Sequence, residues 1–325
     1  MLEQFVQKIK EIPDSFRIKY SRSFRWSAKG YRMRFNRFGL DPNTVLSRWE
    51  DGSRKTPSDL SVILLNDIGG FEYWNMEALS SLEKQRPGIS RVLYREYGIL
   101  NYSRYPEELL VEQFDQRAIT DKPYGVIIDA VADYNGSRLH YSNHNILRKL
   151  RSDLQGKYFL RIAEVDGKYG LARALIGLNN RYGETQKISF ALLRGHGTRE
   201  SVQLGSLADR GSLSLEDLKG ESAKKVKDFF VPNPMIVITA CHTGETNGLG
   251  ERLAEVLQGR VMAPDGVSAL ESLNTSIDEA SIILTPDYTN GVHTKFYSAK
   301  YKNISVWSPI GDGRIWGRSS SEILP

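Results

Sequence analysis

The clearest pattern along this chain is a series of short, continuous apolar runs that begins at residue 124. Each of the first four runs is followed by a stretch whose apolar positions have helical spacing. Apolar strands with intervening helices are typical of a parallel sheet that is covered on both faces. The predicted strands are 124–131, 158–165, 187–193, 234–240, 260–264 and 280–286, and the predicted helices are 143–155, 168–180, 216–230 and 249–257.

This alternation predicts an α/β fold, built as three α/β/α layers around a mostly parallel sheet. Right-handed crossovers produce that arrangement, and ligands then bind at the carboxyl ends of the strands. The last part of the chain, residues 293–316, carries Gly-rich turns and predicts a β-hairpin or flap.

The part of the chain before residue 120 has a different pattern, mostly helical and irregular. Composition and periodicity change across residues 115–123, which predicts a boundary between a mainly helical N-terminal domain (1–120) and an α/β domain (121–325). The predicted N-terminal helices are 3–12, 43–49, 58–66, 75–84 and 106–114.

The composition is that of a globular chain. A length of 325 residues favours two domains, and 40% hydrophobic with 26% charged residues exclude collagen-like, low-complexity and wholly disordered proteins. No apolar run reaches about 18 residues, and the pattern of the first residues predicts a short amphipathic helix rather than a signal peptide. We therefore expect no transmembrane segment and a cytoplasmic location, while delivery to another cell as an effector stays open.

The chain has one Cys and five His. A single Cys excludes an internal disulfide and a zinc site with two or more thiolates. His140 and His144 have i,i+4 spacing, but the Asn and Ser residues around them are typical of a turn. We predict no metal site, and the sequence implies no organic cofactor.

The net charge of +5 is concentrated near the N-terminus. Residues 16–38 contain eight Lys or Arg, no acid and seven aromatic residues. Such a segment could bind nucleic acid, an anionic membrane surface, an acidic regulatory partner or a polyanionic ligand. The alternative is an ordinary half-buried strand and helix with solvated charges, and no recognised nucleic-acid motif accompanies the segment. The candidate anion-binding residues are Arg22, Arg25, Lys29, Arg32, Arg34 and Arg37.

Two reactive side chains follow predicted strands. His196 lies between two glycines after strand 187–193, and Cys241 follows strand 234–240. If these strands are neighbours, the imidazole can exchange the proton of an attacking thiol, and the N–H groups of Gly197 and Cys241 can stabilise an oxyanion. A helix that begins near residue 249 would favour the thiolate form. The alternative is a buried core Cys and an ordinary loop His.

The motifs RGHGT (194–198) and ITACHTGE (238–245), with a helix between them and a helix after, resemble those of the caspase-like cysteine peptidases, or clan CD. They are most similar to CHAT-type peptidases and to the self-cleaving protease domains of bacterial toxins. The resemblance covers residues 124–264. It implies an endopeptidase acting on a protein or peptide, with His196 as general base and acid, Cys241 as nucleophile, and Gly197 with the Cys241 amide as oxyanion donors.

Specificity and control are implied only by that resemblance. The primary substrate pocket of these peptidases takes residues from the end of the first strand, where Asp129 and Asp133 would favour a basic P1 side chain. Alternatively, these acids cap a helix or face water. The resemblance also implies self-cleavage, near Arg117 or Lys122, and activation by a polyphosphate ligand. Two other functions stay open, an inactive caspase-like scaffold and a nucleic-acid-binding protein that uses residues 16–38. The chain has neither a GxxxxGK[ST] nor a GxSxG motif.

Overall fold

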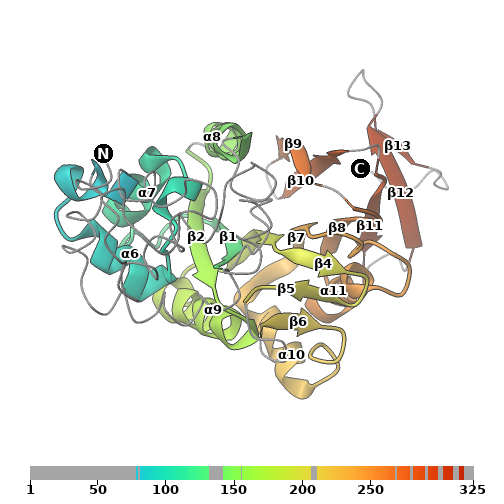
Figure 1. The fold of residues 1–325 in the computed structure, drawn as a ribbon. Coiled ribbons are helices and arrows are strands. Elements are labelled where there is room, and N and C mark those ends of the chain that lie inside the picture. Colours follow the sequence, from blue (N-terminus) through green and yellow to red (C-terminus); the bar gives the residue numbers. More distant parts are fainter. Residues whose placement is uncertain are drawn as a thin grey trace, which may run out of the picture.

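The computed structural model describes residues 78–79, 81–131, 142–154, 156–205, 211–267, 269–278, 281–289, 292–298, 303–309 and 315–317. Its centre is an eight-stranded sheet with the order β13-β12-β11-β8-β7-β3-β1-β2 (Figure 1). The strands from β8 to β2 are all parallel, and β11, β12 and β13 are antiparallel to their neighbours. The strands are β1 (Tyr124–Ala130), β2 (Phe159–Val165), β3 (Ile188–Arg194), β7 (Phe230–Thr239), β8 (Arg260–Pro264), β11 (Thr294–Ser298), β12 (Asn303–Pro309) and β13 (Ile315–Gly317).

The central strands are mostly apolar because both faces of the sheet are covered. Every residue of β1, β2 and β3 is buried. Burial on both faces explains why these strands are continuous apolar runs rather than alternating ones. Charged residues in them occur mainly toward the carboxyl ends, where the candidate site lies.

Helices and a hairpin cover the two faces. In Figure 1, α8 (Ser142–Leu154) lies above the sheet, whereas α9 (Lys168–Tyr182), α10 (Glu221–Val226) and α11 (Leu249–Leu257) lie below it. Helix α9 buries one stripe of its surface, and the spacing of that stripe is helical. Its buried residues are Leu171, Leu175, Leu178 and Tyr182.

Two small sheets accompany the large one. β9 (Leu270–Ile277) and β10 (Ile282–Tyr288) form an antiparallel hairpin, in which β9 contacts α8 and β10 contacts β7. The other small sheet contains β4 (His196–Thr198), β5 (Ser201–Gln203) and β6 (Ser212–Ser214), and it begins directly after β3.

The segment before the sheet belongs to the same hydrophobic core. Helix α6 (Ile89–Tyr97), the 3-10 helix η1 (Tyr102–Arg104) and α7 (Glu107–Asp115) precede β1, and both α-helices contact β2. Leu93 and Leu110 are buried in the cluster that contains the central strands. The predicted boundary at residue 120 therefore falls within one packed unit. The rest of the predicted N-terminal domain lies outside the described residues and stays a prediction.

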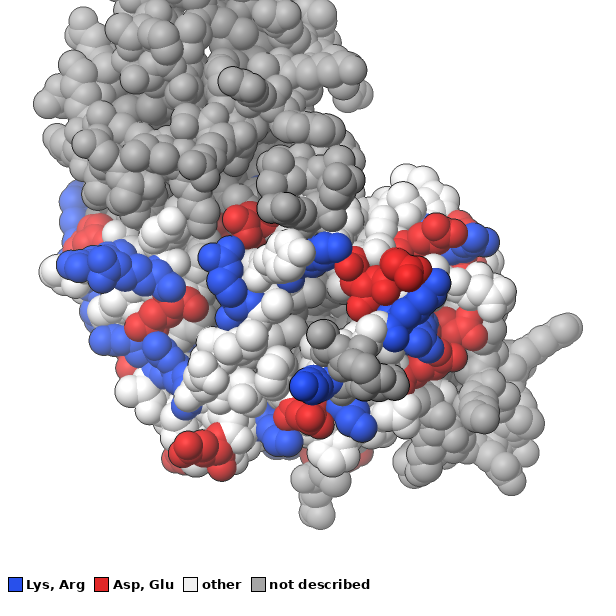
Figure 2. All heavy atoms as spheres, turned by 90° about the horizontal axis from the view of Figure 1, so that it is seen from below, with Lys and Arg blue, Asp and Glu red and all other residues white. Residues whose placement is uncertain are grey.

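The face that bears α9, α10 and α11 carries charges of both signs beside one another (Figure 2). Many of them form pairs, including Lys168 with Asp217 at 2.6 Å and Arg252 with Glu255 at 2.6 Å. Interspersed charges of this kind are typical of a solvated surface. The strongly basic segment 16–38 lies outside the described residues.

A mixed α/β fold with a mostly parallel sheet is thus confirmed, and the predicted spans of α11 and β8 agree with the structure. Other details differ. The predicted strand 280–286 pairs with β9 outside the main sheet, and the predicted helix 216–230 shortens to α10 followed by the 3-10 helix η2 (Lys227–Phe229). The C-terminal hairpin forms, but β11 pairs with β8, so the hairpin extends the main sheet.

Candidate active site

The two reactive side chains follow neighbouring strands. β3 and β7 are adjacent and parallel, and Arg194 at the end of β3 is the register partner of Thr239 at the end of β7. His196 and Cys241 each come two residues after these partners. The carboxyl ends of parallel strands meet at one edge of the sheet, so the sheet brings both residues to that edge. Both are half-buried.

Gly197 brings the two chain segments into direct contact. A Cβ atom built on Gly197 would lie 2.5 Å from the carbonyl oxygen of Cys241 and 2.8 Å from the carbonyl carbon of Ala240. A real Cβ atom needs about 3.5 Å from such atoms. Only glycine therefore allows β4 to pass this close to the backbone at Cys241. The contact joins the residue after His196 to Cys241 itself.

Gly195 has a similar steric role on the other side of His196. A Cβ atom there would collide with the side chain of Val202 and would lie 2.7 Å from the carbonyl oxygen of Gln203. The chain can therefore turn out of β3 and pair at once with β5. Both glycines of the Gly-His-Gly motif are therefore required by close approach to neighbouring segments of the chain.

The pairing of β4 with β5 orients the Gly197 amide. Thr198 and Ser201 are partners across a two-residue turn, so they form a hydrogen-bonded pair of the antiparallel ladder. The next pair along, Gly197 with Val202, is then the non-hydrogen-bonded kind. The N–H of Gly197 consequently points away from β5, as an oxyanion donor requires.

The loop after Cys241 is held by hydrogen bonds to the ends of β8 and β11. The His242 N–H donates to the Gly266 carbonyl at 3.0 Å, and the Gly244 N–H donates to the Pro264 carbonyl at 2.7 Å. The buried hydroxyl of Tyr297 donates to the Gly244 carbonyl at 2.8 Å. Burial, with nearby carboxylates, raises the pKa of Tyr297, so this phenol stays a neutral donor at physiological pH.

A second histidine lies beside the candidate nucleophile. His242 adopts a left-handed conformation with φ 62°. Its Nδ1 atom lies 2.7 Å from Oε1 of Glu245, and both side chains are more than a third exposed. Sequence reasoning did not assign a role to this pair, although the adjacency of His242 to Cys241 was visible. The pairing with Glu245 inside the loop needed the structure.

The beginning of α11 differs from the expectation. The Leu249 N–H donates to the Arg199 carbonyl at 2.8 Å, and the Gly250 N–H donates to the Thr243 carbonyl at 2.9 Å. These two N–H groups are therefore bonded to backbone carbonyls rather than directed at the thiol of Cys241. These two hydrogen bonds hold the β4–β5 turn and the loop after Cys241 against the N-terminus of α11.

Of the two predicted pocket acids, Asp129 lies in the interior. Asp129 is fully buried, with its carboxylate 3.4 Å from the Arg194 guanidinium and 3.3 Å from the Tyr105 hydroxyl. A pocket wall needs an exposed carboxylate, so this position does not fit that expectation. Burial beside an arginine could not be foreseen from an acid at a strand end. Asp133 and the basic residues between 16 and 38 lie outside the described residues.

A cleft of about 470 Å³ lies at the opposite end of the strands and is separate from Cys241. It is lined by residues that include Lys122 before β1 and Phe159 at the start of β2. Across the described ranges there is no group of three or more potential metal ligands, and none of the described helices is long and apolar enough to cross a membrane.

Comparisons with family models, curated proteins and solved structures return no match to this chain.

Proposed function

We propose that this chain is a cysteine endopeptidase of caspase-like fold, with Cys241 as nucleophile and His196 as general base and acid. The observation that carries the proposal is the contact between the backbones of Gly197 and Cys241 at the ends of two adjacent parallel strands. The resemblance of both motifs to the caspase-like peptidases supports the same assignment. The described layers are compatible with the three-layer α/β/α arrangement of that family.

The reaction is acyl transfer through a thioester. His196 accepts the thiol proton, and the sulfur of Cys241 attacks the carbonyl carbon of the scissile peptide bond. The carbonyl electron pair moves to oxygen, where the N–H groups of Gly197 and Cys241 donate to the oxyanion. The C–N bond then breaks, and the proton on His196 passes to the leaving amine. A water molecule hydrolyses the thioester, with His196 accepting its proton and returning a proton to the sulfur.

The test is labelling with thiol-reactive peptide probes that differ at P1, together with cleavage of matching peptides. Cys241 is the only Cys in the chain, so any thiol adduct identifies it. We expect Cys241→Ala to abolish labelling and cleavage, and His196→Ala to lower the cleavage rate by about 10²–10⁴-fold. A basic P1 preference would support the specificity expected from the resemblance, and a preference for Asp or Leu would refute it.

The second histidine provides a matched control. His242→Asn removes the imidazole that is next to Cys241 in sequence, and Asn tolerates the left-handed backbone at this position. We expect His242→Asn to keep most of the wild-type cleavage rate, whereas His196→Ala loses it. Equal probe labelling of wild type and His196→Ala, together with no cleavage of any peptide by the wild type, would refute the enzyme and favour a scaffold.

The expected partners concern residues outside the described part of the chain. An anionic ligand at residues 16–38 would act on the peptidase from the N-terminal segment, and a change in cleavage rate with inositol hexakisphosphate would test this idea. Salt-dependent oligonucleotide binding would instead favour nucleic-acid recognition. A cytoplasmic location and self-cleavage near Arg117 or Lys122 also stay predictions.

A further inference from the structure

Three charged residues form a row across the carboxyl ends of neighbouring strands. Glu164 of β2, Asp129 of β1 and Arg194 of β3 are register partners in turn. Register partners in adjacent parallel strands place their side chains on the same face of the sheet. All three are buried, with 4%, 0% and 5% of their surface exposed. A sheet interior contains such a row only where the charges contact one another.

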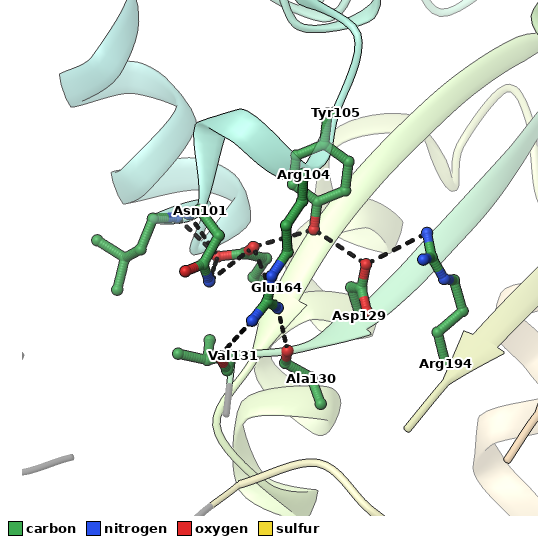
Figure 3. Close-up of polar contacts among 9 residues, drawn as sticks. Asn101, Arg104, Tyr105, Asp129, Ala130, Val131, Glu164 and Arg194 are labelled. Atoms are coloured by element: carbon green, nitrogen blue, oxygen red, sulfur yellow. Dashed lines mark hydrogen bonds and ion pairs between the residues drawn. The ribbon is translucent and has the colours of Figure 1, made fainter. Parts of the chain in front are cut away.

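Tyr105 joins the two carboxylates of this row (Figure 3). Its hydroxyl lies 3.0 Å from Glu164 and 3.3 Å from Asp129, and Asp129 in turn lies 3.4 Å from the Arg194 guanidinium. Burial raises the pKa of Tyr105 well above its usual value, and the two carboxylates raise it further. The phenol therefore stays protonated and bridges two acids that would otherwise repel each other.

The other end of the row is bonded to the segment that precedes α7. Glu164 accepts the Leu100 N–H at 2.7 Å and the Asn101 side-chain amide at 2.9 Å. The Arg104 guanidinium lies 3.9 Å from Glu164 and donates to the Ala130 carbonyl at 2.7 Å. The assembly thus contains two cations and two carboxylates. It connects residues 100–105 to the ends of β1, β2 and β3.

A buried ionic network of this kind is a poor source of stability. Well-packed apolar side chains of similar volume often stabilise a core as much or more, because removing charges from water is costly. What the network does provide is a fixed geometry at the end of β3. Arg194 is the last residue of that strand and stands two residues before His196.

The glycines on both sides of His196 make this geometry important. Neither Gly195 nor Gly197 has a side chain that could anchor the backbone around the imidazole. The pairing of β4 with β5 holds the chain after His196. Before His196, the nearest side chain that can fix the backbone is that of Arg194, which forms an ion pair with Asp129.

We propose that Asp129 and Tyr105 are positioning residues for His196, acting through Arg194 on the end of β3. This inference rests on the proposed function, because it gives His196 a chemical role that depends on its position. Neither residue contacts substrate. The segment 100–105 then forms part of the support of the active site, so changes in that segment affect the reactivity of Cys241.

The experiment measures the rate of Cys241 alkylation by iodoacetamide against pH, with kcat and KM for a cleaved peptide, in Asp129→Asn and Tyr105→Phe. A displacement of about 1 Å at a reacting group costs on the order of 10²-fold in rate. We expect Asp129→Asn to lower kcat by about that factor with little change in KM, and to move the alkylation profile toward that of His196→Ala. Tyr105→Phe leaves the Arg194 contact in place and should have a smaller effect in the same direction.

Leu154→Ala is the matched control, since Leu154 ends α8 and lines the cleft at the opposite end of the strands. Its side chain is 1% exposed, so the cavity left by this substitution lowers the melting temperature away from the charged row. We expect it to keep the wild-type alkylation profile. Wild-type profiles in both Asp129→Asn and Tyr105→Phe would overturn the positioning role while leaving the dyad intact. A wild-type profile in His196→Ala would overturn the dyad and the positioning role together.

Discussion

Replacing Gly197 by Ala tests the contact on which the proposed site depends. The added Cβ atom would lie 2.5 Å from the Cys241 carbonyl oxygen, and 2.8 Å from both the carbonyl carbon and the Cβ atom of Ala240. Ordinary contacts between such atoms begin at about 3.5 Å, so one of the two segments must move by about 1 Å. The obstructing atoms are mostly backbone, which cannot rotate away as the end of a flexible side chain can.

The magnitude follows from this overlap. Forcing one extra carbon into a packed site typically costs about 1–3 kcal/mol. Each kcal/mol lowers the melting temperature by about 2–4 °C in a domain of roughly this size. The movement also separates β4 from Cys241, and a misplacement of about 1 Å lowers the catalytic rate on the order of 10²-fold. Calorimetry and peptide cleavage measure the two effects separately.

Gly177 offers the opposite case in the same chain. It lies in the interior of α9 on the exposed side, and a Cβ atom there would meet nothing within 4 Å. Gly177→Ala should therefore raise the free energy of unfolding by about 0.5–1 kcal/mol, because Ala favours the helix. If Gly197→Ala keeps the wild-type melting temperature and cleavage rate while Gly177→Ala behaves as expected, the close approach at Cys241 is refuted.

Three further substitutions probe the buried charged row, the Lys168–Asp217 ion pair and the loop after Cys241. Burial raises the pKa of Glu164 above 4.5. The contribution of this carboxyl group to the free energy of unfolding is therefore present below pH 4.5 and is lost as pH rises through the pKa that Glu164 has in the folded protein. The melting temperature of wild type, relative to that of Glu164→Gln, should therefore rise as pH falls from about 7 to 4. A difference between the two melting temperatures that stays constant with pH would contradict this. Burial alone would raise the pKa of Asp217, but hydrogen bonds from Lys168 and Ser214 outweigh it and lower that pKa. Asp217→Asn should thus cost about 1 kcal/mol at neutral pH, with the cost disappearing as pH falls below 3.8, which urea titrations at several pH values can check. Tyr297→Phe removes a donor from two carbonyls of the loop after Cys241 and should cost about 1–2 kcal/mol, with faster amide hydrogen exchange in that loop; unchanged exchange would show that the hydroxyl does not hold it.

Much of the fold was predictable because it follows from local patterns. A strand that is buried on both faces is mostly apolar, so β1, β2 and β3 were visible as apolar runs, and α9 was visible from its stripe of buried Leu. Helix α6 was missed, although its buried positions Ile89, Leu93 and Tyr97 have helical spacing. The three-residue strands of the small sheet were missed because strands so short carry no periodicity of their own.

The sequence by itself determined which residues are chemically capable, namely one thiol and a Gly-flanked imidazole, each placed directly after an apolar strand. Tertiary structure decided that those strands are neighbours in register, because strand order depends on contacts between residues far apart in the chain. It also decided the role of Asp129. An acid at a strand end can face substrate, water or another charge, and only the register that places Asp129 beside Arg194 and Glu164 assigns it to the interior.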